Sequence, residues 1–565
     1  MNRIFYQSSF WHKVILGILI VGYLFMTITS SLGDSTTSDE RIHLVSGVSY
    51  LRQHTYALNP EHPPLIKILS ASLVTFLNFR GVNPFEAKDI PIDLVLFLGR
   101  LPNILLGLVL GLLIFAWLKR STNTWWALLG SGFYFLDPNI IAHSHYITTD
   151  IGVTLGIFLS VFGLYLYEQT SKKLPYIIML LGISIALLSK FSGVIVLVLI
   201  PLLWVVSRYV LKKDATKFSW KNLILLLFYS LLALAACYAL VMYRQPVSEI
   251  IETIGSYDRY PVVGRSIIVA LSHIPFITPL VEYLYGLGIV LGHASVGHDL
   301  PQYLLGNFQY QGWSWYFPFA MLIKTQLGLI IYSLLALLLY TFSLIKSTTK
   351  KQMMSYSAII ICISLLTLSL AFLPSKLNIG IRHILPLYPF IILAVTHLAS
   401  YAYTRLAHHG LKRYVPLLCA VAITISVVDV VRIYPHFLSY FNNLIYTPDN
   451  GHHAIIDSNI DWGQDLKRLS LWYKEHRVQP LYVDYFGGAY LSEYFSPQDN
   501  VQSWSVDKGF PKTGYLAVSV QYMYQSLFFA GMKKSPYSYQ ALLNQEPALK
   551  IGYSIYIYDI RALSL

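Results

Sequence analysis

The chain contains a series of apolar runs, each about 20 residues long, that leave little choice of fold. A helix needs about 20 mainly apolar residues to cross a hydrocarbon core of about 30 Å. The runs that meet this requirement are residues 14–32, 94–118, 125–142, 151–167, 175–190, 193–210, 222–243, 316–345, 356–373, 380–404 and 414–432. We therefore predict a polytopic α-helical membrane protein with about 11 transmembrane helices.

The composition excludes the soluble classes of protein. Charged residues make up 12% of the 565 residues and hydrophobic residues make up 55%, whereas about 25% of the residues of an ordinary soluble domain are charged. The net charge is +13, but the chain has no basic stripe with stacking aromatic residues, so nucleic acid is not an expected partner. The membrane lipid bilayer is the expected surrounding.

The basic residues fall in every second loop between the predicted spans, as in Lys119-Arg120 and Lys172-Lys173. Cytoplasmic loops of membrane proteins are enriched in lysine and arginine. The pattern predicts a cytoplasmic N-terminus and an extracytoplasmic C-terminus. Three segments then lie outside the membrane, namely a first outer loop 33–93, a second outer loop 244–315 and the tail 433–565. Residues 266–295 are apolar enough to span or to re-enter the membrane, and the pattern leaves both open.

The tail differs from the rest of the chain. Residues 481–486, 515–520 and 551–558 alternate apolar and polar side chains, which predicts strands. Between the span 414–432 and the first strand, Asp461 and Gln464 resemble a helix cap before side chains at helical spacing. We predict two domains, a transmembrane domain 1–432 and a small soluble α/β domain 433–565.

The first outer loop carries the acidic residues of greatest interest. Asp39 and Glu40 follow the first span, and His43, Glu61 and His62 lie further along before a double proline. A carboxylate at the membrane surface can act as a general base toward an acceptor hydroxyl or amine. The alternative is that Asp39 and Glu40 cap a loop helix.

A second acidic residue, Asp150, follows His143 and His145 where the third and fourth spans meet. Ionisable groups at membrane depth are costly and usually functional. Capping of the fourth span is the alternative role for Asp150. For the two histidines, polar lining of a substrate cavity is favoured over a shared metal ion.

Basic residues near the outer ends of the spans form a third group. Its members are Arg100, Lys190, Lys324, Arg382 and His383. A guanidinium or ammonium group beside apolar helices suits the phosphate of a lipid. Contact with an ordinary lipid headgroup is the alternative.

Several short motifs recur here in the order known from one family. They are Asp39-Glu40-x-x-His43 with a following Pro-Pro-Leu, Gly99-Arg-Leu-Pro102, Thr149-Asp150, Lys190-Phe-Ser-Gly193, Gly312-Trp-Ser-Trp-Tyr-Phe-Pro318, Arg382-His-Ile-Leu-Pro386, Tyr434–Asn442 and Asp457–Leu466. In this order the chain resembles the membrane glycosyltransferases of the GT-C fold, specifically the dolichyl-phosphate-mannose protein mannosyltransferase superfamily. It is also similar to the lipid A aminoarabinose transferases.

The resemblance implies an inverting glycosyltransferase that moves a sugar from a polyprenyl-phosphate donor to an extracytoplasmic acceptor. It implies Asp39 as general base with Glu40 beside it, and Asp150 as a second acid at the acceptor site. Arg100, Lys190 and Arg382 would hold the donor phosphate, with His383 and His62 beside them. The substrate cavity would be lined by His43, Glu61, His143, His145 and Lys324. The expected location is a bacterial inner membrane.

Two departures from the family pattern limit this assignment. Glu61-His62 replaces the Glu-Lys of the aminoarabinose transferases, and Lys324-Thr-Gln326 replaces Lys-Thr-Pro. The sugar and the acceptor, which could be protein, lipid or envelope glycan, therefore stay open. The sequence contains no recognised metal-binding motif. Glu61, His43 and His62 could together bind a divalent cation, so dependence on a metal is left open. The alternative functions are a flippase of lipid-linked saccharide and a non-catalytic assembly subunit.

Overall fold

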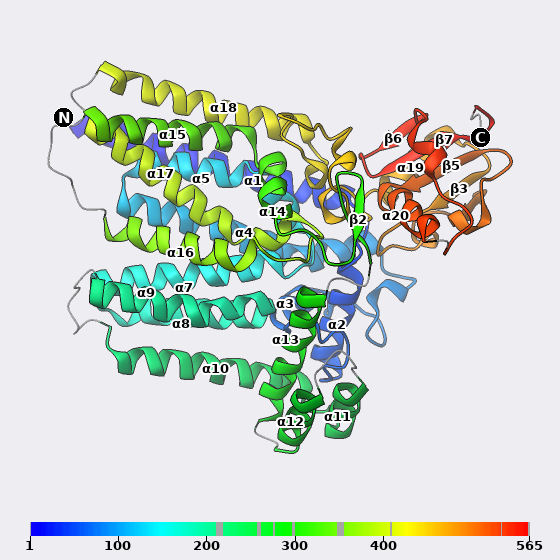
Figure 1. The fold of residues 1–565 in the computed structure, drawn as a ribbon, viewed down its shortest axis with the longest axis horizontal. Coiled ribbons are helices and arrows are strands. Elements are labelled where there is room, and N and C mark those ends of the chain that lie inside the picture. Colours follow the sequence, from blue (N-terminus) through cyan, green and yellow to red (C-terminus); the bar gives the residue numbers. More distant parts are fainter. Residues whose placement is uncertain are drawn as a thin grey trace.

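The computed structural model describes residues 2–210, 218–256, 262–274, 277–296, 300–346, 355–406, 410–532 and 534–562. Long helices run side by side as a bundle, and the C-terminal residues form a separate sheet domain at one end of it (Figure 1). The N-terminus lies at the opposite end of the bundle. The site described below lies at the end that carries the sheet domain.

Eight of the described helical stretches are long and apolar enough to cross a membrane. They are formed by α1 (Asn2–Gly33), α4 (Ile92–Ser121), α7 (Asp150–Thr170), the stretch Phe191–Tyr209 with α9 (Val196–Val205) at its centre, α10 (Trp220–Met242), α15 (Leu327–Lys346), α17 (Leu387–Arg405) and α18 (Val415–Ile433). The apolar helices α8 (Lys173–Ser189) and α16 (Tyr356–Phe372) are shorter. The predicted polytopic helical fold is confirmed.

Two predicted spans are each divided between two α-helices. Residues 125–142 form α5 (Thr124–Phe135) and α6 (Pro138–His145), because the buried Asp137 carboxylate accepts hydrogen bonds from Asn139 and Ile140 and so starts a new helix. Residues 316–345 form α14 (Tyr316–Lys324) and α15, which begins where the carboxylate of Asp429 accepts the backbone N–H of Leu327. Neither capping contact changes the average hydropathy of its segment, so the sequence prediction treated each pair of helices as one span.

The two long loops fold against the end of the bundle. The first contributes α2 (Glu40–Arg52) and α3 (Leu65–Val74). These helices can lie close together because Gly47 has no side chain; a Cβ there would overlap the carbonyl of Lys67. The second contributes α11 (Val247–Ser256), α12 (Val262–Ser272), α13 (Thr278–Val296), β1 (Gln302–Leu304) and β2 (Asn307–Gln309). In Figure 1, α13 runs across the direction of the bundle helices, so residues 278–296 follow the bundle end instead of traversing it.

The C-terminal domain is a five-stranded mixed sheet in the order β4-β3-β5-β7-β6. Its strands are β3 (Leu481–Asp484), β4 (Val501–Ser503), β5 (Tyr515–Ser519), β6 (Leu549–Ile551) and β7 (Ile555–Asp559), and its helices are α19 (Leu466–His476), α20 (Val520–Gly531) and α21 (Gln540–Leu543). Strand β3 pairs in parallel with β4 and β5, whereas β7 pairs antiparallel with β5 and β6. The predicted α/β character is confirmed.

Two details of the tail were predicted wrongly. Residues 551–558 are not one strand, because Gly552 and Tyr553 have φ of 58° and 70° and turn the chain between β6 and β7. Asp461 does not cap α19, which begins at Leu466. Its carboxylate accepts the backbone N–H groups of Gly463 and Gln521 instead.

Candidate active site

Four charged side chains from four parts of the chain meet at the end of the bundle. Arg382, in the short helix η4 (Ile381–Ile384) before α17, donates from Nη1 to Asp39 Oδ2 at 2.8 Å and lies 3.9 Å from Asp150 Oδ2. Lys190, just after α8, donates to Asp150 Oδ1 at 2.6 Å. The sequence prediction named all four residues, and the structure brings them together.

The positions of the two acids argue against simple helix capping. Asp39 precedes α2 and Asp150 begins α7, yet neither helix start has a side-chain capping hydrogen bond. Both carboxylates turn instead toward Arg382 and Lys190. The Asp150 side chain is 1% exposed, whereas the Asp39 side chain is 28% exposed. Asp39 is thus the carboxylate that an incoming substrate can reach.

Buried polar atoms without a hydrogen bond gather around these charges. Among the described residues, no hydrogen-bond partner is found for Asp150 Oδ2, His383 Nε2, His143 Nδ1 or His62 Nδ1. Buried polar groups in native proteins almost always have a partner, so such a concentration indicates a place for a polar ligand or water. Each of these residues was predicted to lie in the site.

Two histidines of the first outer loop line the same region as neutral rings. His62 and His43 pack edge to face with their ring centres 5.1 Å apart. The Nδ1–H of His43 donates to the carbonyl of Ile147 at 2.8 Å. Burial, aided by neighbouring cations, lowers the pKa of His62 well below its ordinary value, and burial lowers the pKa of His43 as well. Both rings are therefore uncharged near neutral pH.

Glu40 and Arg100 form a separate, completely buried ion pair. Arg100 donates from Nε and Nη2 to Glu40 at 2.7 and 2.6 Å, and its other N–H groups bind the carbonyls of Ser31, Asp34 and Ser35. Glu40 also accepts the backbone N–H groups of Thr37 and Ile147. All five guanidinium N–H groups have protein acceptors, so none is left for a phosphate.

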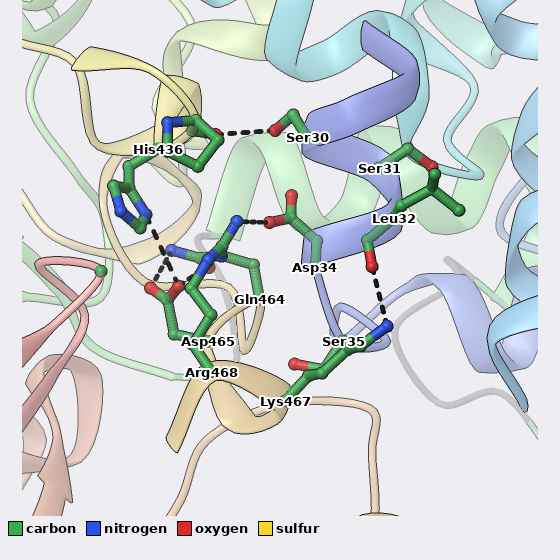
Figure 2. Close-up of polar contacts among 12 residues, drawn as sticks. Ser30, Ser31, Leu32, Asp34, Ser35, His436, Gln464, Asp465, Lys467 and Arg468 are labelled. Carbon is green, nitrogen blue, oxygen red and sulfur yellow. Dashed lines mark hydrogen bonds and ion pairs between the residues drawn. The ribbon is translucent and has the colours of Figure 1, made fainter. Parts of the chain in front are cut away.

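A third polar network joins α1 and α6 to the C-terminal domain. Arg468 lies between Asp34 and Asp465, at 2.6 and 2.5 Å (Figure 2). His145 contacts the other oxygen of Asp34 at 3.0 Å, so its ring belongs to this network and not to the charged cluster. Although burial opposes ionisation, Arg468 and His145 hold the pKa of Asp34 below its usual range. This network fixes the sheet domain on the bundle.

Two further residues predicted for the site, Lys324 and Glu61, make no contact with the charged cluster in the described interactions. Lys324 is fully buried and donates to the carbonyls of Leu438 and Asn459 at 2.8 and 2.6 Å. Glu61 is exposed on the loop before the double proline. Lys324 thus joins α14 to the segment that follows α18.

The structure adds residues that the motif search quoted without assigning them a role. Ser458 accepts a hydrogen bond from Arg382 Nε at 3.1 Å, and the guanidinium of Arg382 lies 4.1 Å from the ring centre of Trp462. The partly buried Asp457 carboxyl is near enough for the charge of Arg382 to oppose the effect of desolvation, which raises the pKa of Asp457 to about 6. The sequence signal for these residues was the dense polar motif Asp457–Leu466. Its role could not be predicted, because it depends on this segment packing against η4 in the folded chain.

The fold and the charged cluster define a multi-pass membrane protein whose polar site lies at one end of its helical bundle, beside an α/β domain. Residues 14–245 match the family model described as dolichyl-phosphate-mannose-protein mannosyltransferase. The resemblance predicted from the motifs is thereby confirmed, over the part of the chain that carries Asp39, Asp150 and Lys190. No match was found among curated proteins.

Three solved structures illustrate the structural likeness. ArnT from Cupriavidus metallidurans in the apo state is 12% identical, with a TM-score of 0.38 and coverage of 98% of both chains. The S. cerevisiae protein O-mannosyltransferase Pmt1-Pmt2 complex bound to the sugar donor is 12% identical, with a TM-score of 0.48 and coverage of 86% of this chain and 94% of that chain. The Archaeoglobus fulgidus oligosaccharyltransferase in the apo form is 13% identical, with a TM-score of 0.46 and coverage of 83% and 58%.

Among the residues that the structure describes, no group of three or more His, Cys, Asp or Glu side chains is arranged to hold a metal ion. The divalent cation that the sequence left open therefore has no set of ligands within that part of the chain.

Proposed function

We propose that the protein is an inverting glycosyltransferase that moves a sugar from a polyprenyl-phosphate donor to an acceptor on the extracytoplasmic side of the membrane. The observation that carries this proposal is the contact of one guanidinium, Arg382, with two carboxylates, Asp39 and Asp150, beside a second cation, Lys190. The family match of residues 14–245 supports the same class of reaction.

Arg382 and Lys190 are the cations suited to the donor phosphate. Both are largely buried, at 7% and 9% exposed, where an ion pair with phosphate is stronger than in water. His383 lies beside them with an unpartnered Nε2. Arg100 is not proposed as a phosphate ligand, since its five N–H groups are engaged, and Glu40 holds the loop with it.

Asp39 is the proposed general base. Its carboxylate is paired with Arg382. A donor phosphate that binds Arg382 competes for this pairing and frees the carboxylate to accept the proton of the acceptor hydroxyl or amine. The acceptor atom then forms a bond to the anomeric carbon from the face opposite the leaving group. The bond from that carbon to the phosphate oxygen breaks, and polyprenyl phosphate leaves with the electron pair.

The proposed orientation follows from the charge of the loops. With the N-terminus in the cytoplasm, the basic loops are cytoplasmic and the α/β domain is extracytoplasmic. The location of the two ends of the chain at opposite ends of the bundle supports this arrangement (Figure 1). A bacterial inner membrane is the proposed location, with the bilayer supplying the lipid donor.

The test compares Asp39→Asn with wild type as the only copy in cells, using mass spectrometry of the polyprenyl-phosphate sugars. We expect one such species to accumulate in the variant and, in purified protein, transfer to fall about 10²- to 10⁴-fold. The matched control is Asp93→Asn, which changes an exposed acid at the same end of the bundle. Equal lipid pools and equal transfer in a folded Asp39→Asn protein would refute the assignment and favour a flippase or an assembly subunit.

A further inference from the structure

The C-terminal domain contains a cleft of its own, with a volume of about 550 Å³. It opens where β3 and β4 end. Its walls come from the segment after β3, the segment after β4 and one face of α20. The charged cluster of the bundle contributes none of its lining residues.

The order of the strands explains why the cleft lies there. The chain leaves β3 toward β4 on one side, and it leaves β5 through α20 toward β7 on the other side. Since β3 and β5 are parallel neighbours, the segments after them diverge and leave a crevice at the carboxyl ends of the strands. Ligands of open α/β sheets bind at such a point.

The lining combines aromatic faces with hydrogen-bonding groups. Tyr485, Tyr490, Trp504 and Tyr522 contribute rings, and the polar side chains include Asp484, Asp507 and Gln525. None of the described lining residues is lysine or arginine. Outside the lining, Lys508 lies 5.3 Å from the ring centre of Trp504 and Arg41 lies 4.4 Å from that of Tyr490. These two cations balance the two carboxylates, so a neutral ligand is favoured over an anion or a cation.

One buried side chain in this cleft lacks the partner it needs. Gln525 is 4% exposed, and its Nε2 has no hydrogen-bond partner among the described residues. A buried amide N–H without a hydrogen-bond partner lowers the stability of the folded state, and such groups are rare in native proteins. A ligand oxygen within the cleft would satisfy it. This observation is independent of the strand order and of the aromatic lining.

We propose that this cleft binds a neutral saccharide. A pyranose ring has C–H groups on its faces and hydroxyl groups around its rim. The faces suit the rings of Trp504 and Tyr522, and the hydroxyls suit the amide of Gln525 and the nearby carboxylates. The volume is in the range of ordinary small-molecule sites.

Contacts at the rim connect the cleft to the first outer loop. The guanidinium of Arg41, in α2, lies 4.4 Å from the ring centre of Tyr490, and its Nε donates to the carbonyl of Gly488 at 2.6 Å. Gly488 in turn donates to the carbonyl of Thr36 at 3.2 Å. The saccharide is therefore the acceptor glycan, a statement that rests on the proposed function.

The test measures saccharide binding to the full-length protein in detergent by saturation-transfer NMR and calorimetry. The probes are neutral tetrasaccharides of glucose, mannose and galactose, with tetragalacturonate as an anion and tetramethylammonium as a cation. We expect at least one neutral probe to bind, and Gln525→Met and Trp504→Ala each to weaken it about three- to tenfold. The matched control for Trp504→Ala is Trp472→Ala, in α19 and outside the cleft.

Gln525→Met also has a second readout. Since Gln525 Nε2 has no hydrogen-bond partner among the described residues, its replacement should leave the melting temperature unchanged or raise it. The proposal is overturned if no neutral probe binds, if only the anion or the cation binds, or if both cleft variants bind as tightly as wild type. Sugar transfer by Asp39→Asn separates the two proposals. If a neutral saccharide binds wild type and the cleft variants weaken that binding, while Asp39→Asn transfers sugar normally, the proposed function fails and the saccharide site stands.

Discussion

Replacement of Glu40 by glutamine should affect folding, whereas replacement of the adjacent Asp39 by asparagine should affect the reaction. Glu40 is fully buried and accepts four hydrogen bonds, two from Arg100 and two from backbone N–H groups. Breaking a buried ion pair by removing one partner costs about 3–5 kcal/mol, because the other charge is left uncompensated. Asp39 is 28% exposed, and its replacement leaves Arg382 with Asp150 and Ser458, so no charge is left uncompensated and the cost should be smaller.

The assay is chemical unfolding of the purified protein, followed by limited proteolysis of the first outer loop. Glu40→Gln should unfold at a lower denaturant concentration than wild type, and Asp39→Asn should remain close to wild type. Arg100→Met should destabilise by a similar amount. The double variant should cost less than the sum of the two single changes, because it leaves no buried charge alone.

The reverse ranking would refute this reasoning. If Glu40→Gln is as stable as wild type and loses sugar transfer, then the pair with Arg100 is not what holds the loop, and Glu40 becomes the candidate base. If the two single changes at Glu40 and Arg100 are additive, the residues do not act as a pair despite their contact.

Two further predictions concern the donor and acid stability. Lys190→Met should raise the KM for the lipid-linked donor about 10- to 100-fold, because a charge-assisted hydrogen bond to the phosphate is lost; Lys173→Met at the opposite end of the bundle is the control, and an unchanged KM would contradict the assignment. Burial lowers the pKa of His452 to about 3, so the folded state resists protonation and stability is lost as pH falls below about 6.5, by about 2 kcal/mol at pH 5. His452→Gln should therefore lose less stability than wild type between pH 7 and pH 5 in thermal unfolding, and an identical pH dependence would count against it.

Several features could be predicted from residues that are near one another in the chain. The apolar runs predicted α1, α4, α7 and α10, because the length that crosses a bilayer is a local property of the sequence. The alternation in the tail predicted β3 and β5 for the same reason. The breaks at Asp137 and before Leu327 were missed, since each depends on a single carboxylate and not on average hydropathy.

The motifs also named the charged residues before their partners were known. Asp39, Asp150, Lys190 and Arg382 stood out because ionisable groups are costly near the membrane. Residue type and order could not separate Asp39 from Glu40. The two acids are adjacent in the chain, and one faces Arg382 while the other faces Arg100.

That separation required the folded chain. The first outer loop lies far in the sequence from η4 and from the segment Asp457–Asp465. These three parts of the chain meet only when the bundle and the sheet domain are assembled. The cleft at the ends of β3 and β4 has the same origin, because the order of the strands in the sheet cannot be deduced from the sequence of any single strand. Local patterns set which segments are helix, strand or membrane span. Which charge meets which depends on long-range packing, where burial makes one partner far better than another.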